Sequence, residues 1–349
     1  MAALGDPLAD VGYALLYWGT KGRPTFHASQ GIADLEELAA AFPERERRRS
    51  LGDNAPGPVR HPGPRGRGRG APVYDEILYE VDDPVATITL DRPDSLNAWT
   101  NRMGSEVRHA VGRAERDPAV VGIVITGAGR AFCAGADMNL LTSITEGGAT
   151  GEGTRDDLEV PPLPPGTPAD LDGTYTWLMA GTKPVIAAIN GAVAGMAVPI
   201  ALCCDIRFMA DDAVLLTAFA QRGLIAEWGL SWLLTRLAGP AVALDLLMSS
   251  RKVTGEECAR LGLVNASLPA GELLSHSRRY LEDIAARCSP ASLAVMKRQV
   301  YSQLHAGLGP AERESQRLML ESFGRPDFKE GVQSFLGKRP PSFARLGEG

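Results

Sequence analysis

Two short glycine-containing segments have residue types that could stabilise a negative charge through main-chain N–H groups. Gly129–Asp137 (GRAFCAGAD) follows one apolar run, and Asn190–Pro199 (NGAVAGMAVP) follows another. Small residues let backbone N–H groups approach a ligand closely, and the positive end of a following helix would favour a developing anion. Glycine at the end of a strand is also ordinary turn chemistry. On the residues alone, both interpretations stay open.

No metal site or disulfide framework is predicted from the cysteines. The five cysteines form no Cys-x-x-Cys pair and do not alternate with histidine. Cys133 lies in the first glycine segment, and we interpret it as a small buried hydrophobic residue because no base is near it in sequence. His109, His276 and His305 lie on predicted helices and are expected at the surface.

Strands must position the two glycine segments. Ile77–Val81 and Val85–Leu90 are short β-type runs on either side of Asp82-Asp83-Pro84, and they predict a β-hairpin. The runs Val120–Thr126 and Pro184–Ile189 are almost continuously apolar, which is typical of strands buried on both faces. Strands that alternate with helices predict an α/β fold with a mostly parallel, helix-covered sheet.

Helices are predicted over Asn101–Arg116 and Ala192–Leu202, and the chain from Ser231 onward is helical in pattern. Helix stops are predicted at Gly239-Pro240, Gly262 and Ser289-Pro290. Residues 146–172 are rich in Gly, Pro, Thr and acidic residues and predict a mobile loop, which could close over a ligand or stay disordered.

A change of composition divides the chain into residues 1–50, a linker at 51–72 and a regular domain at 73–349. The linker is rich in Pro, Gly and Arg and has almost nothing to bury. An RNA-binding arm is the alternative for the Arg/Gly run at 65–70, but the run is short and lacks interleaved aromatic residues.

Residues 1–18 resemble the segment that follows the metal-binding Asp of aminoglycoside-phosphotransferase-like kinases. The catalytic loop and ATP-binding segment of that family would have to precede this stretch, so the resemblance implies no kinase chemistry. We interpret residues 1–50 as a gene-fusion remnant or the product of a misplaced start codon. Asp6 and Asp10 would otherwise be helix-capping and turn residues.

Composition excludes several classes of partner. A formal net charge of -6 over 349 residues argues against a nucleic-acid-binding surface. No export signal is recognisable, and no run reaches the roughly 18 apolar residues of a membrane span. We expect a cytoplasmic protein with no nucleic-acid or membrane partner.

Four motifs, in order, resemble the landmarks of the crotonase (enoyl-CoA hydratase/isomerase) superfamily. They are Leu90–Ala98 (LDRPDSLNA), Ala131–Asp137 (AFCAGAD), Lys183–Gly191 (KPVIAAING) followed by Cys204-Asp205, and Phe328–Arg339 (FKEGVQSFLGKR). The resemblance implies an α/β crotonase-like ββα spiral, with a core at 73–270 and C-terminal oligomerisation helices at 271–349. It also implies assembly into a homotrimer or homohexamer.

The chemistry shared by this superfamily is a thioester enolate held by two main-chain N–H groups, here those of Ala136 and Met196. Relatives usually have Gly at the second position, but Met keeps the same N–H. The resemblance maps the contacts with coenzyme A to Asp94, Ser95, Leu96, Ala134, Asp137 and Met138. It implies no cofactor beyond the coenzyme A carried by the substrate.

Two departures from the family bear on coenzyme A. Asp94 replaces a frequent Lys, which puts a favourable phosphate contact there in doubt. Lys297 and Lys338 are candidates for the nucleotide phosphates, with solvated helix charges as the alternative. Trp99, Trp177 and Trp228 could line an acyl pocket or serve general packing.

The resemblance also bears on the reaction. Pro199 and Phe219 occupy the positions of the two hydratase glutamates, and neither side chain can transfer a proton. Glu227 matches the single catalytic glutamate of peroxisomal-type 3-enoyl-CoA to 2-enoyl-CoA isomerases. Ile225, Trp228 and Trp232 could desolvate it and raise its pKa.

The alternative for Glu227 is a structural acid in the first turn of a helix from Leu230. Hydratase, hydrolase or dehalogenase-type chemistry remains open, because superfamily membership does not settle the reaction. A catalytically silent CoA-binding subunit is a further alternative, in view of the two missing glutamates.

Overall fold

A computed structural model describes residues 74–145, 154, 155, 157–160 and 162–347 of the chain. The described residues belong to one compact unit, residues 69–349. The segment that resembles a phosphotransferase, the linker, and part of the loop expected at 146–172 lie outside them.

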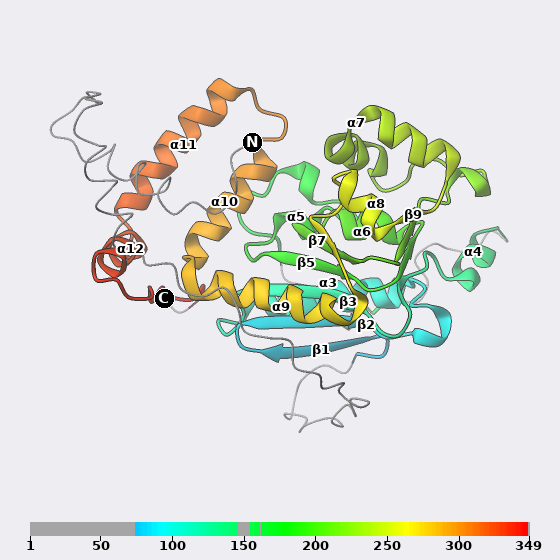
Figure 1. The fold of residues 1–349 in the computed structure, drawn as a ribbon, viewed down its shortest axis with the longest axis horizontal. Helices are drawn as coiled ribbons and strands as arrows, with labels where there is room; N and C mark the ends of the chain where they lie inside the picture. The colour runs from blue at the N-terminus through cyan, green and yellow to red at the C-terminus, as the bar shows by residue number, and fades with distance from the viewer. Residues whose placement is uncertain (1–73, 146–153, 156, 161, 348–349) are drawn as a thin grey trace, which may run out of the picture. The chain divides into compact units, whose positions relative to one another are not determined.

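Six strands form the larger sheet, in the order β1-β2-β3-β5-β7-β10 (Figure 1). β1 and β2 form the predicted hairpin, and the other neighbours in this sheet are parallel. The central strands β3 and β5 are buried along almost their whole length, as their continuous apolar runs predict. The strands are β1 Ile77–Asp82, β2 Val85–Leu90, β3 Gly122–Gly127, β5 Val185–Ile189, β7 Ile206–Ala210 and β10 Ala266–Leu268.

Four short strands form the second sheet, in the order β4-β6-β8-β9. Three strands of the larger sheet are each followed by a strand of the second sheet: β4 comes after β3, β6 after β5 and β8 after β7. The chain therefore repeats a two-strand unit. This repetition is the expected spiral, and the α/β crotonase-like fold is confirmed. The strands are β4 Ala131–Cys133, β6 Ala192–Ala194, β8 Val214–Leu216 and β9 Val253–Thr254.

The helix predicted over Ala192–Leu202 is wrong in its first part. Ala192–Ala194 is β6, which pairs with β4 and β8, and α6 begins only at Ala197 and ends at Leu202. A short apolar run does not distinguish strand from helix, and pairing with distant strands decides between them. The chain after Ser231 is likewise not wholly helical, because it contains β9 and β10.

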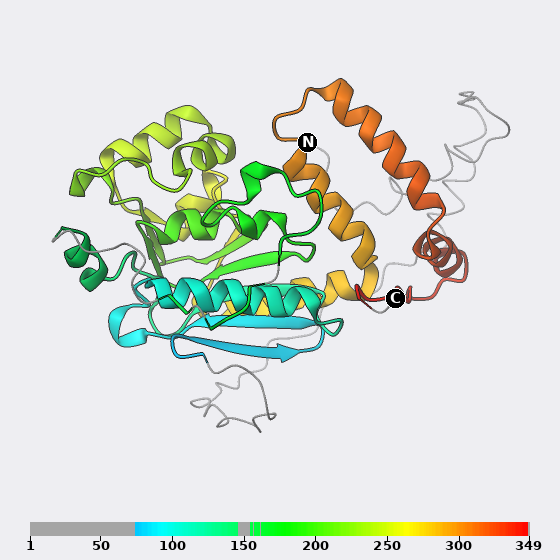
Figure 2. The same cartoon turned by 180° about the vertical axis from the view of Figure 1, so that it is seen from behind.

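Two long helices cover opposite faces of the larger sheet. α9 (Ala270–Arg287) lies across one face in Figure 1, and α3 (Asn101–Arg116) lies across the other in Figure 2. α3 has the predicted bounds, and the Thr100 side chain caps it by accepting from the Met103 N–H. The shorter elements are α4 Met138–Thr145, α5 Trp177–Ala180, α8 Gly255–Arg260, and the 3-10 helices η1 Pro93–Ser95, η2 Ala169–Leu171 and η3 Ala220–Arg222.

α7 (Leu230–Ser249) is interrupted at its middle. Gly239 has φ 80° and ψ 164°, and Pro240 follows, so the predicted stop is confirmed. By length and composition α7 is the one described helix that could cross a membrane. The break divides it into two helices, each much shorter than the ~20 residues that a span needs.

The C-terminal helices α10 (Pro290–Ser302), α11 (Leu308–Phe323) and α12 (Pro326–Leu336) project away from the sheets (Figure 1). The α10 side chain Lys297 fastens them to the core, since its Nζ lies 2.8 Å from Asp205 Oδ2 and donates to two main-chain carbonyls. The side chain of Lys297 is only 7% exposed. The phosphate contact considered for Lys297 is therefore wrong, whereas Lys338 is exposed.

Candidate active site

The two glycine segments lie side by side, at the point where β4 pairs with β6. Gly135 has φ 105° and Gly195 has φ 52°, a backbone region that favours glycine. A Cβ on Gly135 would lie 3.1 Å from the Ala194 carbonyl oxygen and 3.9 Å from the Gly195 Cα. Close approach and backbone conformation both require glycine at position 135.

The N–H groups of Ala136 and Met196 are left without acceptors by this arrangement. Trp99 donates to the Gly135 carbonyl (2.7 Å) and accepts from the Asp137 N–H (3.0 Å), which skips the Ala136 N–H between them. Met196 is the N-cap residue of α6, where main-chain donors have no intrahelical partner. Within the described part of the chain, nothing accepts from either N–H. Two donors on adjacent segments are what an oxyanion needs, and their catalytic role stays a prediction.

The residues expected to contact coenzyme A come from two segments that also lie together. Asp94 and Ser95 are on η1, and Leu96 ends it with a left-handed backbone (φ 52°). The Ala134 N–H donates to the Leu96 carbonyl (3.0 Å), which joins η1 to the first glycine segment, Gly129–Asp137, called the first oxyanion segment from here on. Asp137 is the last residue of that segment, and Met138 begins α4 with 69% of its surface exposed.

The carboxylate of Asp137 is already engaged. Arg92 Nη1 lies 2.9 Å from Asp137 Oδ2, and the Asn139 N–H donates to Asp137 Oδ1. The main chain of Asp137 is engaged as well, because its N–H donates to the Trp99 carbonyl and its carbonyl accepts from the Leu141 N–H. A contact from Asp137 to coenzyme A stays a prediction. Asn97, fully buried, braces the same turn by donating to the Ala128 and Ala131 carbonyls, a role that the sequence analysis did not assign.

Glu227 lies on the segment between η3 and α7, just before the helix begins. Trp228 and Gly229 both have positive φ (56° and 73°), and Gly229 is the N-cap residue of α7. The first turn of α7 contains no acidic residue, so the structural first-turn acid considered for Glu227 is wrong. Its side chain is partly buried and makes no hydrogen bond or ion pair with the described residues. Glu227 therefore has no structural partner there.

Three aromatic rings in edge-to-face contact connect the Glu227 segment to the first oxyanion segment. Trp228 and Tyr175 meet edge to face with ring centroids 5.6 Å apart, and Tyr175 and Trp99 meet at 5.9 Å. Trp99 is the residue that brackets Ala136 through its main chain. Trp99 and Trp228, two of the tryptophans suggested for an acyl pocket, thus lie on this path.

Two residues expected to desolvate Glu227 face elsewhere. Ile225 is 78% exposed. Trp232 packs under Arg236, whose guanidinium carbon lies 3.8 Å from the ring centroid, and beside His305. Of the three apolar neighbours in sequence, only Trp228 belongs to the aromatic path.

The two positions expected to carry hydratase glutamates are apolar. Pro199 is buried in the first turn of α6, and Phe219 is buried at the start of η3. Burial raises the pKa of the Cys133 thiol to about 12, so this thiol stays protonated near neutral pH and is no nucleophile.

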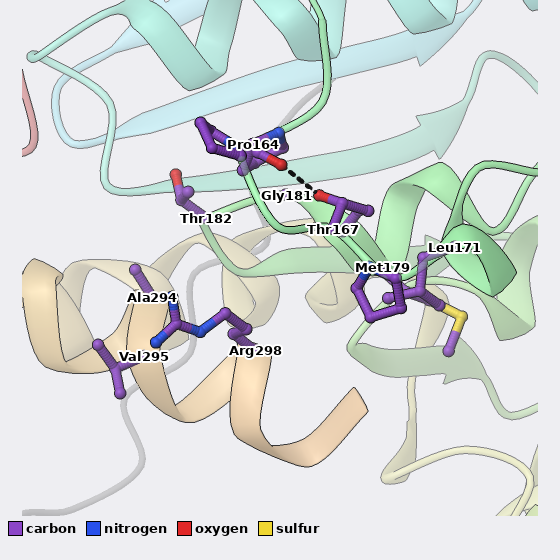
Figure 3. A pocket seen from close by; sticks show the side chains of 12 residues that line it. Pro164, Thr167, Leu171, Met179, Gly181, Thr182, Ala294, Val295 and Arg298 are labelled. Carbon is purple, nitrogen blue, oxygen red and sulfur yellow. Dashed lines mark hydrogen bonds between the residues drawn. The ribbon is translucent and has the colours of Figure 1, made fainter. Parts of the chain in front are cut away.

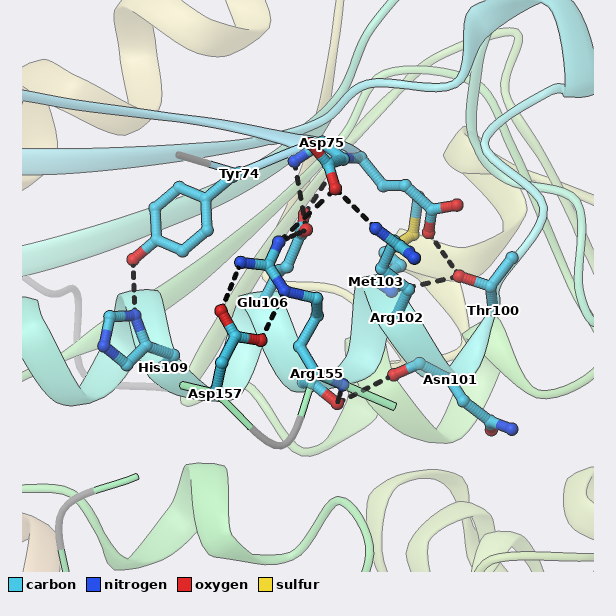
Figure 4. Close-up of polar contacts among 12 residues, drawn as sticks. Tyr74, Asp75, Thr100, Asn101, Arg102, Met103, Glu106, His109, Arg155 and Asp157 are labelled. Carbon is cyan, nitrogen blue, oxygen red and sulfur yellow. Dashed lines mark hydrogen bonds and ion pairs between the residues drawn. The ribbon is translucent and has the colours of Figure 1, made fainter. Parts of the chain in front are cut away.

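The expectation that His109 lies at the surface is wrong. Its ring is buried on α3, and Nδ1 lies 2.8 Å from the Tyr74 hydroxyl (Figure 4). The fully buried Glu106 lies nearby and accepts from the Asp75 and Glu76 N–H groups. Arg155 donates to Glu106 and also pairs with Asp157. This network anchors Arg155 and, through it, Asp157 to α3.

A cavity of about 120 Å³ lies between α10 and residues 164–182 (Figure 3). Pro164, Leu171 and Met179 form apolar walls, and Arg298 lies on the α10 side. It contains none of Glu227, Ala136 or Met196, so it is separate from the candidate active site.

Comparison with known proteins defines the family. Residues 80–345 match the family model of enoyl-CoA hydratase/isomerase. A probable enoyl-CoA hydratase of Rhodobacter capsulatus is 36% identical over 276 residues, which cover 77% of this chain and 98% of the relative. The 1,2-epoxyphenylacetyl-CoA isomerase of Escherichia coli is 33% identical over 274 residues, covering 78% of this chain and 99% of the relative.

Solved structures agree. The crystal structure of a probable enoyl-CoA hydratase/isomerase from Mycobacterium abscessus superposes with a TM-score of 0.66 at 30% identity, covering 78% of this chain and 99% of the other. The chain therefore belongs to the enoyl-CoA hydratase/isomerase family of the crotonase superfamily, and it is an enzyme of that family.

Proposed function

We propose that this enzyme is an enoyl-CoA isomerase that converts 3-enoyl-CoA into 2-enoyl-CoA with Glu227 as its single proton shuttle. One observation carries the proposal. Glu227 is a partly buried carboxylate without a structural partner, and a path of aromatic rings leads from its segment to Ala136. The two positions that carry glutamates in hydratases are apolar here, at Pro199 and Phe219.

The reaction needs one base and one anion site. Glu227 removes a proton from C2 of the acyl group, and the electrons move onto the thioester oxygen as a dienolate. The N–H groups of Ala136 and Met196 hold that oxygen while the charge develops. The same carboxyl then returns the proton to C4, which places the double bond between C2 and C3.

Coenzyme A is part of the substrate in this proposal, bound by residues 94–96 and by Ala134, Asp137 and Met138, which the Ala134 to Leu96 hydrogen bond brings together. A one-base isomerisation needs no further cofactor. All five cysteines are free, which supports a reducing compartment such as the cytoplasm.

Hydration is the second candidate, because several relatives are named as hydratases. Water addition usually requires a carboxylate that positions the water and another that takes its proton. Glu227 alone would have to do both. A silent CoA-binding subunit is the third candidate, and it predicts binding without turnover.

The C-terminal helices support a homotrimer or homohexamer. They expose several large apolar side chains, and soluble monomeric proteins rarely expose large apolar surfaces. These are Met296, Val300, Leu308, Leu320, Phe335 and Leu336. We expect analytical ultracentrifugation to give a mass of three or six chains, and a monomer at micromolar concentration would contradict this.

The decisive experiment compares wild type, Glu227→Gln and Glu256→Gln. Glu256 is an exposed acid in the first turn of α8 and serves as the matched control. With 3-hexenoyl-CoA, we expect Glu227→Gln to lose roughly 100-fold to 10,000-fold in kcat, because general acid-base groups contribute about that much. The control should stay near wild type. Hydration of 2-hexenoyl-CoA that survives Glu227→Gln would show that the catalytic group is another residue.

A further inference from the structure

Tyr175 lies outside all four family motifs, on the turn between η2 and α5. Its side chain is buried, with only 7% of the residue exposed. The ring packs edge to face between Trp99 and Trp228, at interplanar angles of 86° and 69°. Two rings fix the orientation of this phenol, so the position of its hydroxyl is determined by packing.

The hydroxyl of Tyr175 has no partner within the described part of the chain, although the hydroxyl of a buried tyrosine usually finds one. No side-chain N or O atom that is fully enclosed there lacks a hydrogen bond. The Tyr175 hydroxyl must therefore open onto accessible space. A buried ring with an open, unpaired hydroxyl is a polar group that a bound ligand could reach.

The surroundings of Tyr175 locate that space. Burial first, and then electrostatic interactions with Cys133, Glu227 and Cys203, raise the pKa of its hydroxyl well above the ordinary value. The phenol therefore stays neutral and remains a donor near neutral pH. Cys133 belongs to β4, which leads to Ala136, and Cys203 ends α6, which begins after Met196. The ring contacts agree with this location, because Trp99 pairs with Ala136 and Trp228 directly follows Glu227, so Tyr175 lies between the two segments.

We propose that the Tyr175 hydroxyl donates a hydrogen bond to an oxygen atom on the acyl group, so that the enzyme selects acyl-CoA substrates with an oxygen-bearing acyl chain. This inference rests on the proposed function, because the acyl chain must pass between Ala136 and Glu227 for one carboxyl to reach C2 and C4. A ketone, epoxide or hydroxyl oxygen would accept the bond. A plain hydrocarbon chain would displace water and leave the donor unpaired.

The size of the selection follows from that unpaired donor. Sites built to hydrogen-bond a substrate oxygen discriminate strongly against analogues that lack it. For one neutral hydroxyl at the edge of a pocket, we expect roughly 10-fold to 100-fold tighter binding of the oxygenated chain. Glu227 is the competing acceptor for this hydroxyl, but no hydrogen bond joins the two residues in the structure.

Binding of saturated thioesters tests the inference without turnover. Isothermal titration calorimetry on wild type compares hexanoyl-CoA with 4-oxohexanoyl-CoA and 5-oxohexanoyl-CoA. We expect one oxo compound to bind at least about 10-fold tighter. Tyr175→Phe should reduce this ratio to near one without weakening hexanoyl-CoA, which no longer leaves a donor unpaired. Tyr280→Phe is the control, because Tyr280 is partly exposed on α9 and packs on Phe208.

Any of three outcomes would overturn the inference. A wild-type ratio near one for both oxo compounds shows that no acyl oxygen is recognised. The absence of binding by all three compounds would also overturn the inference. Neither result depends on the folding of the variant. If Tyr175→Phe lowers the affinity for all three ligands alike, the hydroxyl supports the fold or the position of Glu227 and does not recognise an acyl oxygen. Isomerisation of 3-hexenoyl-CoA is measured separately. If the enzyme does not isomerise 3-hexenoyl-CoA but still binds an oxo compound more tightly, only the proposed reaction is rejected. If it isomerises 3-hexenoyl-CoA but the affinity ratio is one, only the role of Tyr175 is rejected.

Discussion

The two halves of the candidate active site are built differently. The oxyanion segments lie between paired strands, where the Gly135 carbonyl and the Asp137 N–H are both bonded to Trp99. The Glu227 segment belongs to no sheet. It follows η3 and precedes α7, its neighbour Ile225 is 78% exposed, and Trp228 and Gly229 have left-handed backbones.

This difference separates the chemistry that a fold supplies from the chemistry that a loop supplies. Main-chain donors fixed by strand pairing stabilise any thioester enolate, whatever reaction follows. A side chain on an exposed segment can be exchanged without disturbing the core, and it decides where a proton goes. In this chain the N–H groups predicted for the common half are open, and the two positions expected to carry hydratase carboxylates are Pro199 and Phe219.

Among variants that alter the backbone of the two halves, Gly135→Ala should give the largest effect, and it damages the sheet-built half. The new Cβ would lie 3.1 Å from the Ala194 carbonyl oxygen at a φ of 105°, so the backbone must shift and the Ala136 N–H must turn with it. Loss of one oxyanion donor costs about 100-fold to 1,000-fold in kcat. Steady-state kinetics with 3-hexenoyl-CoA measure this loss.

Gly271→Ala is the control for that variant, since a Cβ on this helical glycine of α9 meets nothing within 4 Å. It should keep full activity and gain slightly in stability, because Ala favours a helix over Gly. Near wild-type turnover in Gly135→Ala would mean that the Ala136 N–H does not hold the enolate.

Gly229→Ala should give an intermediate effect and disturb the loop-built half. Gly229 has φ 73° with open space around a new Cβ, so the cost is backbone strain of about 1 kcal/mol rather than a clash. Relief of that strain should displace Glu227, which lies two residues before Gly229. We expect kcat to fall by about 10-fold, because the rate depends steeply on the position of the catalytic group.

Gly166→Ala imposes the same kind of strain away from the site, because Gly166 has φ 78° and nothing within 4 Å. Urea unfolding should show similar losses of stability for the two variants, and kinetics should show a loss only for Gly229→Ala. Equal kcat values for Gly229→Ala and Gly166→Ala would mean that the position of Glu227 does not depend on the backbone conformation of Gly229.

The parts of the fold that local pattern determines were predictable from the sequence. The hairpin of β1 and β2 and the helix α3 follow from residue types and periodicity within the segment itself. β6 was not predictable, because Ala192–Ala194 becomes a strand only by pairing with β4 and β8. Burial of His109 and Lys297 likewise depends on Tyr74 and Asp205, which are distant in sequence.

The candidate site shows the same limit. Ala136, Met196 and Glu227 came from motifs, and the structure adds the open N–H groups and the missing structural partner of Glu227. Tyr175 carries no sequence motif that points to the site. Only its contacts with Trp99 and Trp228 reveal its position, since residues 99, 175 and 228 meet through tertiary packing alone.

Met196→Gly should give the smallest effect and sharpen the contrast between a main-chain donor and a catalytic side chain. The N–H of residue 196 persists, and Gly is tolerated at an N-cap position. We expect kcat/KM for 3-hexenoyl-CoA to change by no more than about 3-fold. Met196 packs against the core, so its removal should enlarge the pocket and favour 3-decenoyl-CoA relative to 3-hexenoyl-CoA.

Met248→Gly, at a residue 72% exposed on α7, controls for the loss of a methionine from a helical segment. A loss of about 100-fold in Met196→Gly alone, with the fold and coenzyme A binding kept, would contradict the main-chain assignment, because it would give the side chain of Met196 a role in the reaction.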